Sequence, residues 1–207
     1  MSFVIFDTEY TSWKGCLENG WVGTQKKEIV QIAAIRVSDK FEVLDTFNEL
    51  CVPKFNPVLS DYFVELTHIT NEQVKLKGIS FAIAYENFCK FVGNDVCFSH
   101  SWGGEYCSKT DGGIIEDNLT LYGLEHKHNI VFRNIAAVFK ELYRRKNIEI
   151  RSQASGDIVR LLNIEESLEK LKLNSHNSLY DVFSILEGLK YFRDDIVLLN
   201  EKEFILR

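Results

Sequence analysis

Two carboxylates follow a short apolar segment near the N-terminus of the chain. Residues 3–6 are apolar, and Asp7, Thr8 and Glu9 come directly after them. In an extended chain, residues i and i+2 point to the same face, so Asp7 and Glu9 project together. Adjacent carboxylates repel one another unless a cation lies between them, and hard oxygen ligands suit Mg²⁺ or Mn²⁺. The pair therefore indicates a divalent metal site, with a solvated turn after a strand as the alternative.

A histidine and an aspartate in the C-terminal part of the chain form a second pair. His176 and Asp181 are the first and last residues of the sequence HNSLYD. Asp181 is expected to begin a long helix, where a carboxylate caps the first turn and complements the helix dipole. His176 precedes it in a loop, and an imidazole with a pKa of about 6.5 exchanges protons at neutral pH. Taken singly, each is better explained as a helix cap or a surface loop residue.

A polar segment after an apolar run is the remaining candidate. Residues 95–99 are expected to form a strand, and the run from His100 to Asp111 contains Trp102, two glycines and Glu105. Ligand sites of α/β sheets lie beyond the carboxyl ends of the strands. This loop is therefore a candidate site, although Asp111 also opens a helical stretch and has capping as its alternative role.

The composition restricts what the chain can do. Its 207 residues include 15 Phe, 8 Tyr and 3 Trp, which is enough for a hydrophobic core and excludes disorder as the main state. The net charge is −6, whereas a protein that binds nucleic acid broadly through its phosphates is normally basic. Either nucleic acid is not the partner, or bound metal ions neutralise some of the acids.

The sequence also indicates the setting in which the chain works. No apolar run approaches the ~18 residues of a membrane span, and the N-terminus has neither a basic leader nor a small-residue cleavage site. The five cysteines are widely spaced and form no CxxC pair, so neither a disulfide framework nor a zinc site is indicated. We expect a cytoplasmic protein that does not contact membranes.

The expected elements place these residues in one domain that spans residues 1–207. Apolar runs rich in Ile and Val predict strands, and apolar residues at three- and four-residue spacing predict helices. The expected strands are 3–6 (ending at Asp7), 28–38, 41–52, 95–99 and 129–132. The expected helices are 80–92, 114–122, 134–145, 157–162 and 178–192, with a loop between 52 and 80. Three antiparallel strands followed by alternating helices and strands predict an α/β domain with a mixed five-stranded sheet flanked by helices.

The order of these features resembles a known family. The sequence FDTEYT comes first, then EIVQIAAI, ELTHIT at 65–70, the Ser-Trp-Gly run ahead of Asp111, and finally the H-x4-D motif of His176 and Asp181. Together they resemble the DEDDh class of 3′–5′ exonucleases, in the ribonuclease H-like superfamily, over residues 3 to about 189. The strongest elements are FDTEY and H-x4-D, which are in the correct order and at about the right separation. The Ser-Trp-Gly run resembles the branch of the class that contains small RNA-trimming exonucleases.

The resemblance implies roles for five residues. It makes Asp7, Glu9, Asp111 and Asp181 the acids that hold two divalent metal ions, Mg²⁺ or Mn²⁺, and His176 the general base. The implied reaction is hydrolysis of single-stranded nucleic acid, DNA or RNA, from its 3′ end with release of nucleoside monophosphates. Two metal ions support such a reaction by activating water and stabilising the leaving oxyanion. They would also explain how an acidic protein holds a polyanion.

The third acid departs from the family pattern. Relatives have this acid about four residues after the tryptophan, whereas Asp111 follows Trp102 by nine. We choose Asp111 because its distance to Tyr122 and Gly123 matches the helix of the relatives, which makes 103–110 an insertion. Glu105 is the competing candidate.

Substrate contacts are implied by the same resemblance. Leu66 and Thr67 resemble the family's segment that packs on the 3′-terminal nucleotide, and the Tyr10 backbone would lie near its sugar. His68 stands where relatives often carry a small residue, and a core position is the alternative for Leu66. Residues 140–151 hold five basic and two acidic residues, which suits either a phosphate-backbone track or a solvated helix face. Relatives include monomers and homodimers, and either state is open here.

A second hypothesis is a nuclease-fold module that is catalytically weak or inactive and binds nucleic acid or a protein partner. A dead site is expected to lack one acid or the histidine, and all five residues are present when Asp111 is accepted. The exonuclease is therefore favoured. A glycosidase with two carboxylates explains neither His176 nor the ordered acids.

Overall fold

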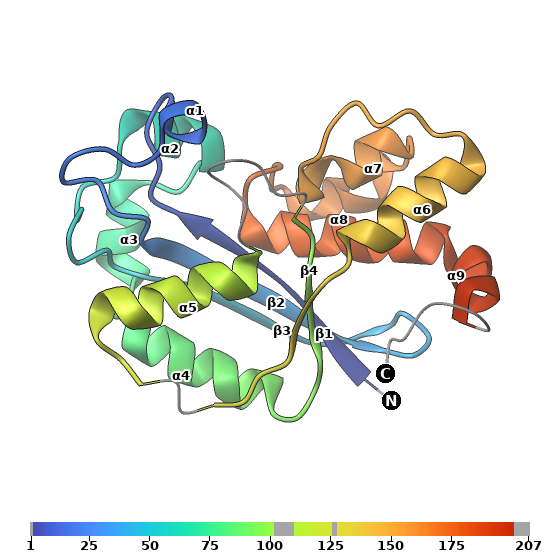
Figure 1. Ribbon diagram of the computed structural model, residues 1–207, viewed down its shortest axis with the longest axis horizontal. Coiled ribbons are helices and arrows are strands. Elements are labelled where there is room, and N and C mark those ends of the chain that lie inside the picture. Colours follow the sequence, from blue (N-terminus) through green and yellow to red (C-terminus); the bar gives the residue numbers. More distant parts are fainter. Residues whose placement is uncertain (1, 102–109, 126–127, 201–207) are drawn as a thin grey trace.

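Five strands form one mixed sheet in the computed structural model, which describes residues 2–101, 110–125 and 128–200 (Figure 1). The strands are β1 (Ser2–Tyr10), β2 (Ile29–Ser38), β3 (Val43–Leu50), β4 (Cys97–Ser99) and β5 (Phe132–Asn134). Their spatial order is β3-β2-β1-β4-β5. β2 pairs with β1 and with β3, and both pairings are antiparallel. β4 pairs with β1 and with β5, and both of these pairings are parallel. The predicted α/β fold with a mixed five-stranded sheet is confirmed.

Helices cover both faces of this sheet. The α-helices are α1 (Cys16–Asn19), α2 (Asp61–Thr67), α3 (Asn71–Lys77), α4 (Phe81–Val92), α5 (Asp111–Tyr122), α6 (Ala136–Lys146), α7 (Ile158–Leu161), α8 (Ser178–Tyr191) and α9 (Arg193–Asn200). Two 3₁₀ helices, η1 (Ser155–Asp157) and η2 (Glu165–Leu171), lie between α6 and α8 in the chain.

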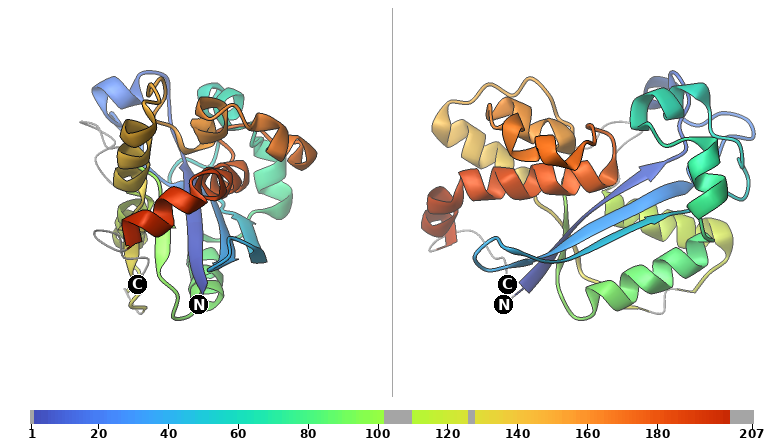
Figure 2. Two further views of the ribbon diagram at one scale, coloured as in Figure 1. Left: turned by 90° about the vertical axis from the view of Figure 1, so that its right-hand side faces the viewer. Right: turned by 180° about the vertical axis from the view of Figure 1, so that it is seen from behind.

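Helices lie on both sides of the sheet (Figure 2), and one cluster of apolar side chains packs between the sheet and the helices on each side. Side chains of β1 alternate between the two clusters: Phe3 and Ile5 pack with α6 and α8, whereas Val4 and Phe6 pack with α4 and α5. The neighbouring strand β2 is buried on both faces, which explains its near-continuous apolar sequence. Gln31 interrupts that sequence, and its side chain is buried on the face that carries α8.

β1 is longer than predicted. The prediction that it ends at Asp7 is wrong, because its pairing with β2 continues to Tyr10, with Asp7 opposite Ala33 and Glu9 opposite Gln31. The long buried run of β2 offers backbone partners over this whole length. Asp7 and Glu9 therefore stand on a paired strand rather than in a turn, which fixes their separation and their common face.

The segment between 52 and 80, predicted as a loop, contains α2 and α3. Ser60 caps α2 by accepting a hydrogen bond from the Phe63 backbone, and Thr70 and Gln73 form a capping box at the start of α3. Both helices pack on a small apolar cluster around Val30. Helices of seven residues show little apolar periodicity, so these caps are the signal that the sequence offers.

Other element boundaries also differ from the predictions by a few residues. β5 covers Phe132–Asn134 rather than 129–132, where it pairs with Cys97–Ser99 of β4. α8 begins at Ser178, as predicted, with Asn177 as its N-cap, so Asp181 lies within the first turn and does not itself begin the helix. The helices α1, η2 and α9 were absent from the prediction. Apart from Thr110, the predicted insertion at 103–110 lies outside the described residues.

The described part of the chain contains no helix that is both long and apolar enough to span a membrane.

Candidate active site

A cavity of about 350 Å³ opens beside the carboxyl end of β1. Its walls come from β1, α2, the first turn of α5, the loop before η1 and the first turn of α8. The five predicted catalytic residues all line it: Asp7, Glu9, Asp111, His176 and Asp181. The fold thus brings together residues from both ends of the chain and its middle.

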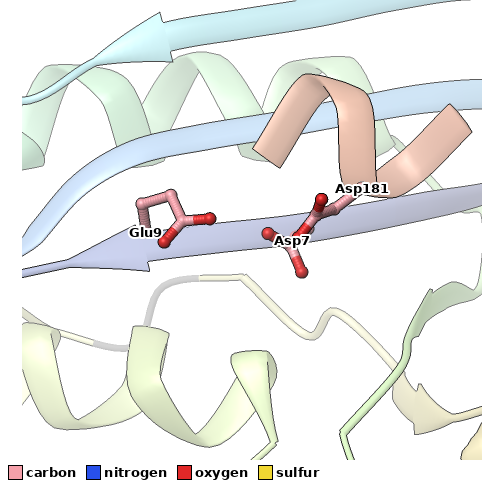
Figure 3. A group of neighbouring side chains, drawn as sticks. All are labelled: Asp7, Glu9 and Asp181. Carbon is pink, nitrogen blue, oxygen red and sulfur yellow. The ribbon is translucent and has the colours of Figure 1, made fainter. Parts of the chain in front are cut away.

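Three of these carboxylates gather on one side of β1 (Figure 3). Asp7 and Glu9 project from alternate positions of the strand, and Asp181 reaches them from α8. One oxygen atom of each lies within 4.8 Å of the other two. Asp7 and Asp181 are buried and Glu9 is half-buried.

Ser155 and the loop before α8 hold Asp181 in this position. The Ser155 hydroxyl donates a hydrogen bond to Asp181 Oδ2 at 3.1 Å and also lies 3.4 Å from Asp7 Oδ1. The His176 backbone N–H donates to Asp181 Oδ1 at 3.2 Å. Ser155 is itself fixed, because its carbonyl accepts a 2.8 Å hydrogen bond from the Ser184 hydroxyl. The carboxylates are therefore positioned before any ligand arrives.

The cluster carries negative charge that the protein does not balance. Burial raises the pKa of Asp7 well above its usual value, and the charges of Asp111, Asp181 and Glu9 raise it further. Burial likewise raises the pKa of Glu9, and it raises the pKa of Asp181 to about 7 although hydrogen bonds oppose the shift. Among the described residues that line the cavity, none is a lysine or an arginine.

This donor set fits divalent metal ions. Three carboxylates offer hard oxygen ligands at short mutual distances, which is what Mg²⁺ and Mn²⁺ prefer. A bound cation would also supply the positive charge that the lining lacks and would lower the pKa values that burial has raised. The residues present can therefore bind the predicted kind of cofactor.

Asp111 faces the same cavity from the first turn of α5. Its Oδ1 accepts hydrogen bonds from the Thr8 backbone N–H at 3.1 Å and the Thr8 hydroxyl at 2.8 Å. Its Oδ2 accepts one from the Ser101 hydroxyl at 3.0 Å. Burial raises the pKa of Asp111, whereas these hydrogen bonds lower it. The carboxylate is thus fixed against β1 beside the cluster, while the competing Glu105 lies outside the described residues.

His176 lines the cavity from the loop before α8. Its backbone has φ of 66°, a left-handed conformation that turns the chain between residue 175 and the helix. Burial lowers the pKa of His176 below 6.5, although the charge of Asp157 acts in the opposite direction. The imidazole is therefore mostly neutral at pH 7 and is able to accept a proton.

The three predicted substrate-binding residues lie in different places. Tyr10 and Leu66 line the cavity, Tyr10 at the end of β1 and Leu66 on α2. Thr67 is buried and does not line it, because its hydroxyl donates to the Phe63 carbonyl and accepts from the Ile69 backbone N–H. The structure thus gives Thr67 a part in ending α2.

Several cavity residues were not predicted from the sequence. Ser155 and Ser101 bind the carboxylates, and His100 and Tyr62 contribute to the walls. Ser155 contacts Asp7 across 148 residues of sequence, and its surroundings, Ala-Ser-Gly, form no recognisable motif. Only the folded chain identifies it.

Gly156 leaves space for the cluster, which makes it a sensitive test of the geometry. A Cβ atom at this position would lie 2.3 Å from Asp181 Oδ1 and 2.4 Å from the Ser175 hydroxyl. Gly156→Ala is therefore expected to displace Asp181 and to weaken Mg²⁺ binding by roughly tenfold or more, the usual effect of disturbing a ligand's support. Calorimetric titration with Mg²⁺ measures this. The control is Gly23→Ala, which meets no atom within 4 Å but places alanine at a φ of 60°, so it introduces backbone strain without disturbing the carboxylates. Equal metal affinity of the two variants would contradict the prediction.

Without metal, the charge of Asp181 is expected to destabilise the folded chain. Its folded pKa of about 7 exceeds the ordinary 3.8, so the folded state holds a proton that the unfolded state releases between these values. Stability therefore decreases as the pH rises from about 4 to about 7. In EDTA at about pH 7.5, Asp181→Asn should raise the unfolding temperature by several degrees, since each kcal/mol corresponds to about 2–4 °C at this length.

This stability difference should vanish below about pH 3, where Asp181 is mostly protonated in both the folded and the unfolded state. With saturating Mg²⁺, the wild type should unfold at a higher temperature than Asp181→Asn, because Mg²⁺ stabilises the wild type more than the variant. Thermal unfolding followed by circular dichroism measures both effects. An Asp181→Asn variant that is less stable than the wild type in EDTA at about pH 7.5 would contradict the burial argument.

The fold and an acidic cavity whose carboxylates can bind divalent metal ions are together typical of nucleases, and comparison with known proteins identifies the family. The chain belongs to the RNase T exonuclease family, whose model matches residues 4–189. A comparison with curated protein sequences finds no match.

Solved structures of nucleases have the same fold. The nuclease domain of 3′hExo, a DEDDh family member bound to rAMP, is 18% identical with a TM-score of 0.64, over 94% of this chain and 92% of that one. Cell-death related nuclease 4 is 17% identical with a TM-score of 0.68, over 94% of this chain and 64% of that one. Exonuclease I of E. coli, in complex with a dT13 oligonucleotide, is 17% identical with a TM-score of 0.70, over 97% of this chain and 42% of that one.

These comparisons confirm the predicted resemblance to the DEDDh exonucleases of the ribonuclease H-like superfamily. The chain spans most of the 3′hExo nuclease domain but less than two thirds of the other two chains.

Proposed function

We propose that the chain is a 3′–5′ exonuclease that hydrolyses single-stranded nucleic acid and releases nucleoside monophosphates. The observation that carries the proposal is the group of carboxylates of Asp7, Glu9 and Asp181, with oxygen atoms within 4.8 Å of one another, in a cavity that His176 also lines. Membership of the exonuclease family supports the same reaction.

The four acids are proposed to hold two divalent metal ions. Asp7, Glu9 and Asp181 are the direct ligands, and Asp111 supplies the fourth carboxylate, fixed in place by Thr8 and Ser101. When bound, such ions activate water and stabilise the negative charge of the leaving oxygen. The carboxylates contribute a rigid frame, because β1 fixes two of them and the hydrogen bonds of Ser155 and His176 fix Asp181.

His176 is proposed as the general base. Burial keeps its imidazole neutral near pH 7, so it is ready to take the proton of the attacking water. Its backbone N–H binds Asp181, so the loop that carries the base and the helix that carries a ligand are positioned together. A shift of one would move the other.

The 3′-terminal nucleotide is proposed to occupy the cavity. A volume of about 350 Å³ is at the lower end of the range for small-ligand sites, which suits about one nucleotide. Leu66 offers an apolar contact for its base, and the end of β1 at Tyr10 lies beside it. The structural relatives include complexes with rAMP and with a DNA oligonucleotide, so both DNA and RNA are candidate substrates.

The test uses a 3′-labelled single-stranded oligonucleotide with Mg²⁺ and then with EDTA, in matched DNA and RNA versions. Release of labelled mononucleotide that EDTA blocks is the expected result, and the ratio of the two rates identifies the preferred sugar. Intact substrate with Mg²⁺ and with Mn²⁺ would contradict the proposal and favour a module that only binds.

A further inference from the structure

A second hollow of about 580 Å³ lies on the same face of the sheet as the active-site cavity. Its floor is formed by the ends of β2 and β3, and its walls by the α2–α3 junction and the segment before α8. Five carboxamide side chains line it: Gln31, Asn48, Gln73, Asn174 and Asn177. We call this hollow the amide cleft.

The amide cleft and the active-site cavity are direct neighbours. Glu9 of the cavity pairs with Gln31 of the cleft across β1 and β2, and Gln31 pairs with Leu50 of β3. Neighbouring strands are about 4.8 Å apart, so the cleft begins one strand away from the carboxylates. The turn at His176 and Asn177 separates them, since His176 lines the cavity and Asn177 lines the cleft.

Gln31 anchors this divider to the sheet. Its side-chain oxygen accepts a 3.0 Å hydrogen bond from the Ser178 backbone N–H, and its side-chain nitrogen donates to Asn48 at 2.8 Å and to Asn177 at 3.4 Å. Gln31 itself is buried, whereas Asn48 is exposed toward the cleft. Gln31 thus holds Asn48 and Asn177 in place, so these three carboxamides form an ordered polar surface.

The charges at the amide cleft favour an anion. Lys77 and Lys172 line it with exposed side chains, and among the described residues neither takes part in an ion pair. The acidic residue of the lining, Glu49, accepts hydrogen bonds from Asn87. His68, which ends α2 in a left-handed conformation, adds a flat ring at the rim.

This combination matches the chemistry of an unpaired polynucleotide strand. Carboxamides bind the edges of bases, lysines bind phosphates, and a histidine ring stacks on a base. A third hollow, near residues 148–165, suits a strand less well, because Arg151 pairs with Glu149 and Arg160 with Asp157. The active-site cavity has space for about one nucleotide, so the rest of a strand must lie on a neighbouring surface.

We propose that the amide cleft binds the nucleotides immediately 5′ of the scissile linkage in a single-stranded substrate. This inference rests on the proposed exonuclease function and adds the path of the strand to it. The strand crosses the divider at His176 and Asn177, with its 3′-terminal nucleotide in the cavity and the preceding phosphates near Lys77 and Lys172.

The test compares a dinucleotide with a 12-residue single strand in the full chain. The variants are Lys77→Ala with Lys172→Ala, and as a matched control Arg151→Ala with Arg160→Ala from the third hollow. For the cleft variant, KM for the 12-mer should rise about tenfold. The kcat/KM for a dinucleotide without a 5′ phosphate should stay unchanged, because its single phosphate is the scissile one and none is left for Lys77 and Lys172. Fluorescence anisotropy in EDTA should show a salt dependence of 12-mer binding that is weaker by about 1.4 in log–log slope, since each lost phosphate contact accounts for about 0.7.

The outcomes separate this inference from the function on which it rests. A wild-type chain that cleaves neither substrate overturns the proposed exonuclease function. If the wild-type chain cleaves both substrates and the cleft variant has the same KM for the 12-mer as the wild type, only the amide-cleft proposal is overturned. If only the Arg151→Ala, Arg160→Ala control loses affinity for the 12-mer, the amide-cleft proposal is also overturned, because the strand would then run over the third hollow.

Discussion

Asp7→Asn is expected to remove nearly all nuclease activity and most of the affinity for Mg²⁺. Asp7 stands at the centre of the carboxylate group, within reach of Glu9 along β1 and of Asp181 from α8. Asparagine keeps the shape of the side chain but removes one charge from the site. Because electrostatic attraction by the carboxylates is what concentrates a divalent ion there, metal binding and turnover should fall together.

The measurement is calorimetric titration with Mg²⁺ alongside turnover of a labelled oligonucleotide. Asp45→Asn, which neutralises an exposed carboxylate on β3, is the matched control and should behave as the wild type. An Asp7→Asn variant with normal Mg²⁺ affinity would show that the metal ions bind elsewhere. Normal turnover in the same variant would remove the carboxylate group from the mechanism.

His176→Ala is expected to lower kcat by roughly 10²–10⁴-fold, the usual contribution of a positioned general base. It leaves every carboxylate in place, and the backbone N–H of residue 176 remains available to Asp181. Metal affinity and binding of single-stranded oligonucleotide should therefore stay close to the wild-type values. This separation of turnover from binding distinguishes the histidine from the acids.

The pH dependence gives a second readout for His176. Only a neutral imidazole accepts a proton, so wild-type turnover at saturating Mg²⁺ should increase with pH through the pKa of this residue. Burial lowers the pKa of His176, so the midpoint should lie below 6.5. In the His176→Ala variant, turnover should no longer increase with pH over this range.

The control for this variant is His128→Ala, which removes a histidine that pairs with Glu86 and does not line the cavity. Near-normal kcat in His176→Ala would make His176 an ordinary loop residue. A loss of Mg²⁺ affinity as complete as that of Asp7→Asn would instead make it a ligand or a structural support.

The parts of the fold that depend on local pattern could be predicted from the sequence. The apolar run of β2 and the periodic spacing in α4 and α8 identify these elements, since burial demands those patterns. The i, i+2 spacing of Asp7 and Glu9 also predicted a shared face correctly. What the pattern missed is that β1 continues through them, because the pairing that extends it comes from β2.

The parts that depend on long-range contacts could not be predicted. Thr8 and Ser101 bind Asp111, and Ser155 bridges Asp7 and Asp181. Thr8 and Ser101 lie within the FDTEYT and Ser-Trp-Gly motifs, but those motifs do not reveal the hydrogen bonds to Asp111, and Ser155 lies in no motif. The sequence marks His68 only as a departure from the family pattern. Its place in the amide cleft follows from the left-handed end of α2, which no composition or spacing reveals.

The most direct test of the central proposal is a time course on a 5′-labelled single strand with the wild-type chain, with and without Mg²⁺, and with Asp7→Asn. We predict a ladder of products that shortens one nucleotide at a time from the 3′ end, only in the wild type and only with metal. Internal cleavage, shortening from the 5′ end, or an undiminished ladder from Asp7→Asn or in EDTA would contradict the proposal that these carboxylates form the metal site of a 3′–5′ exonuclease.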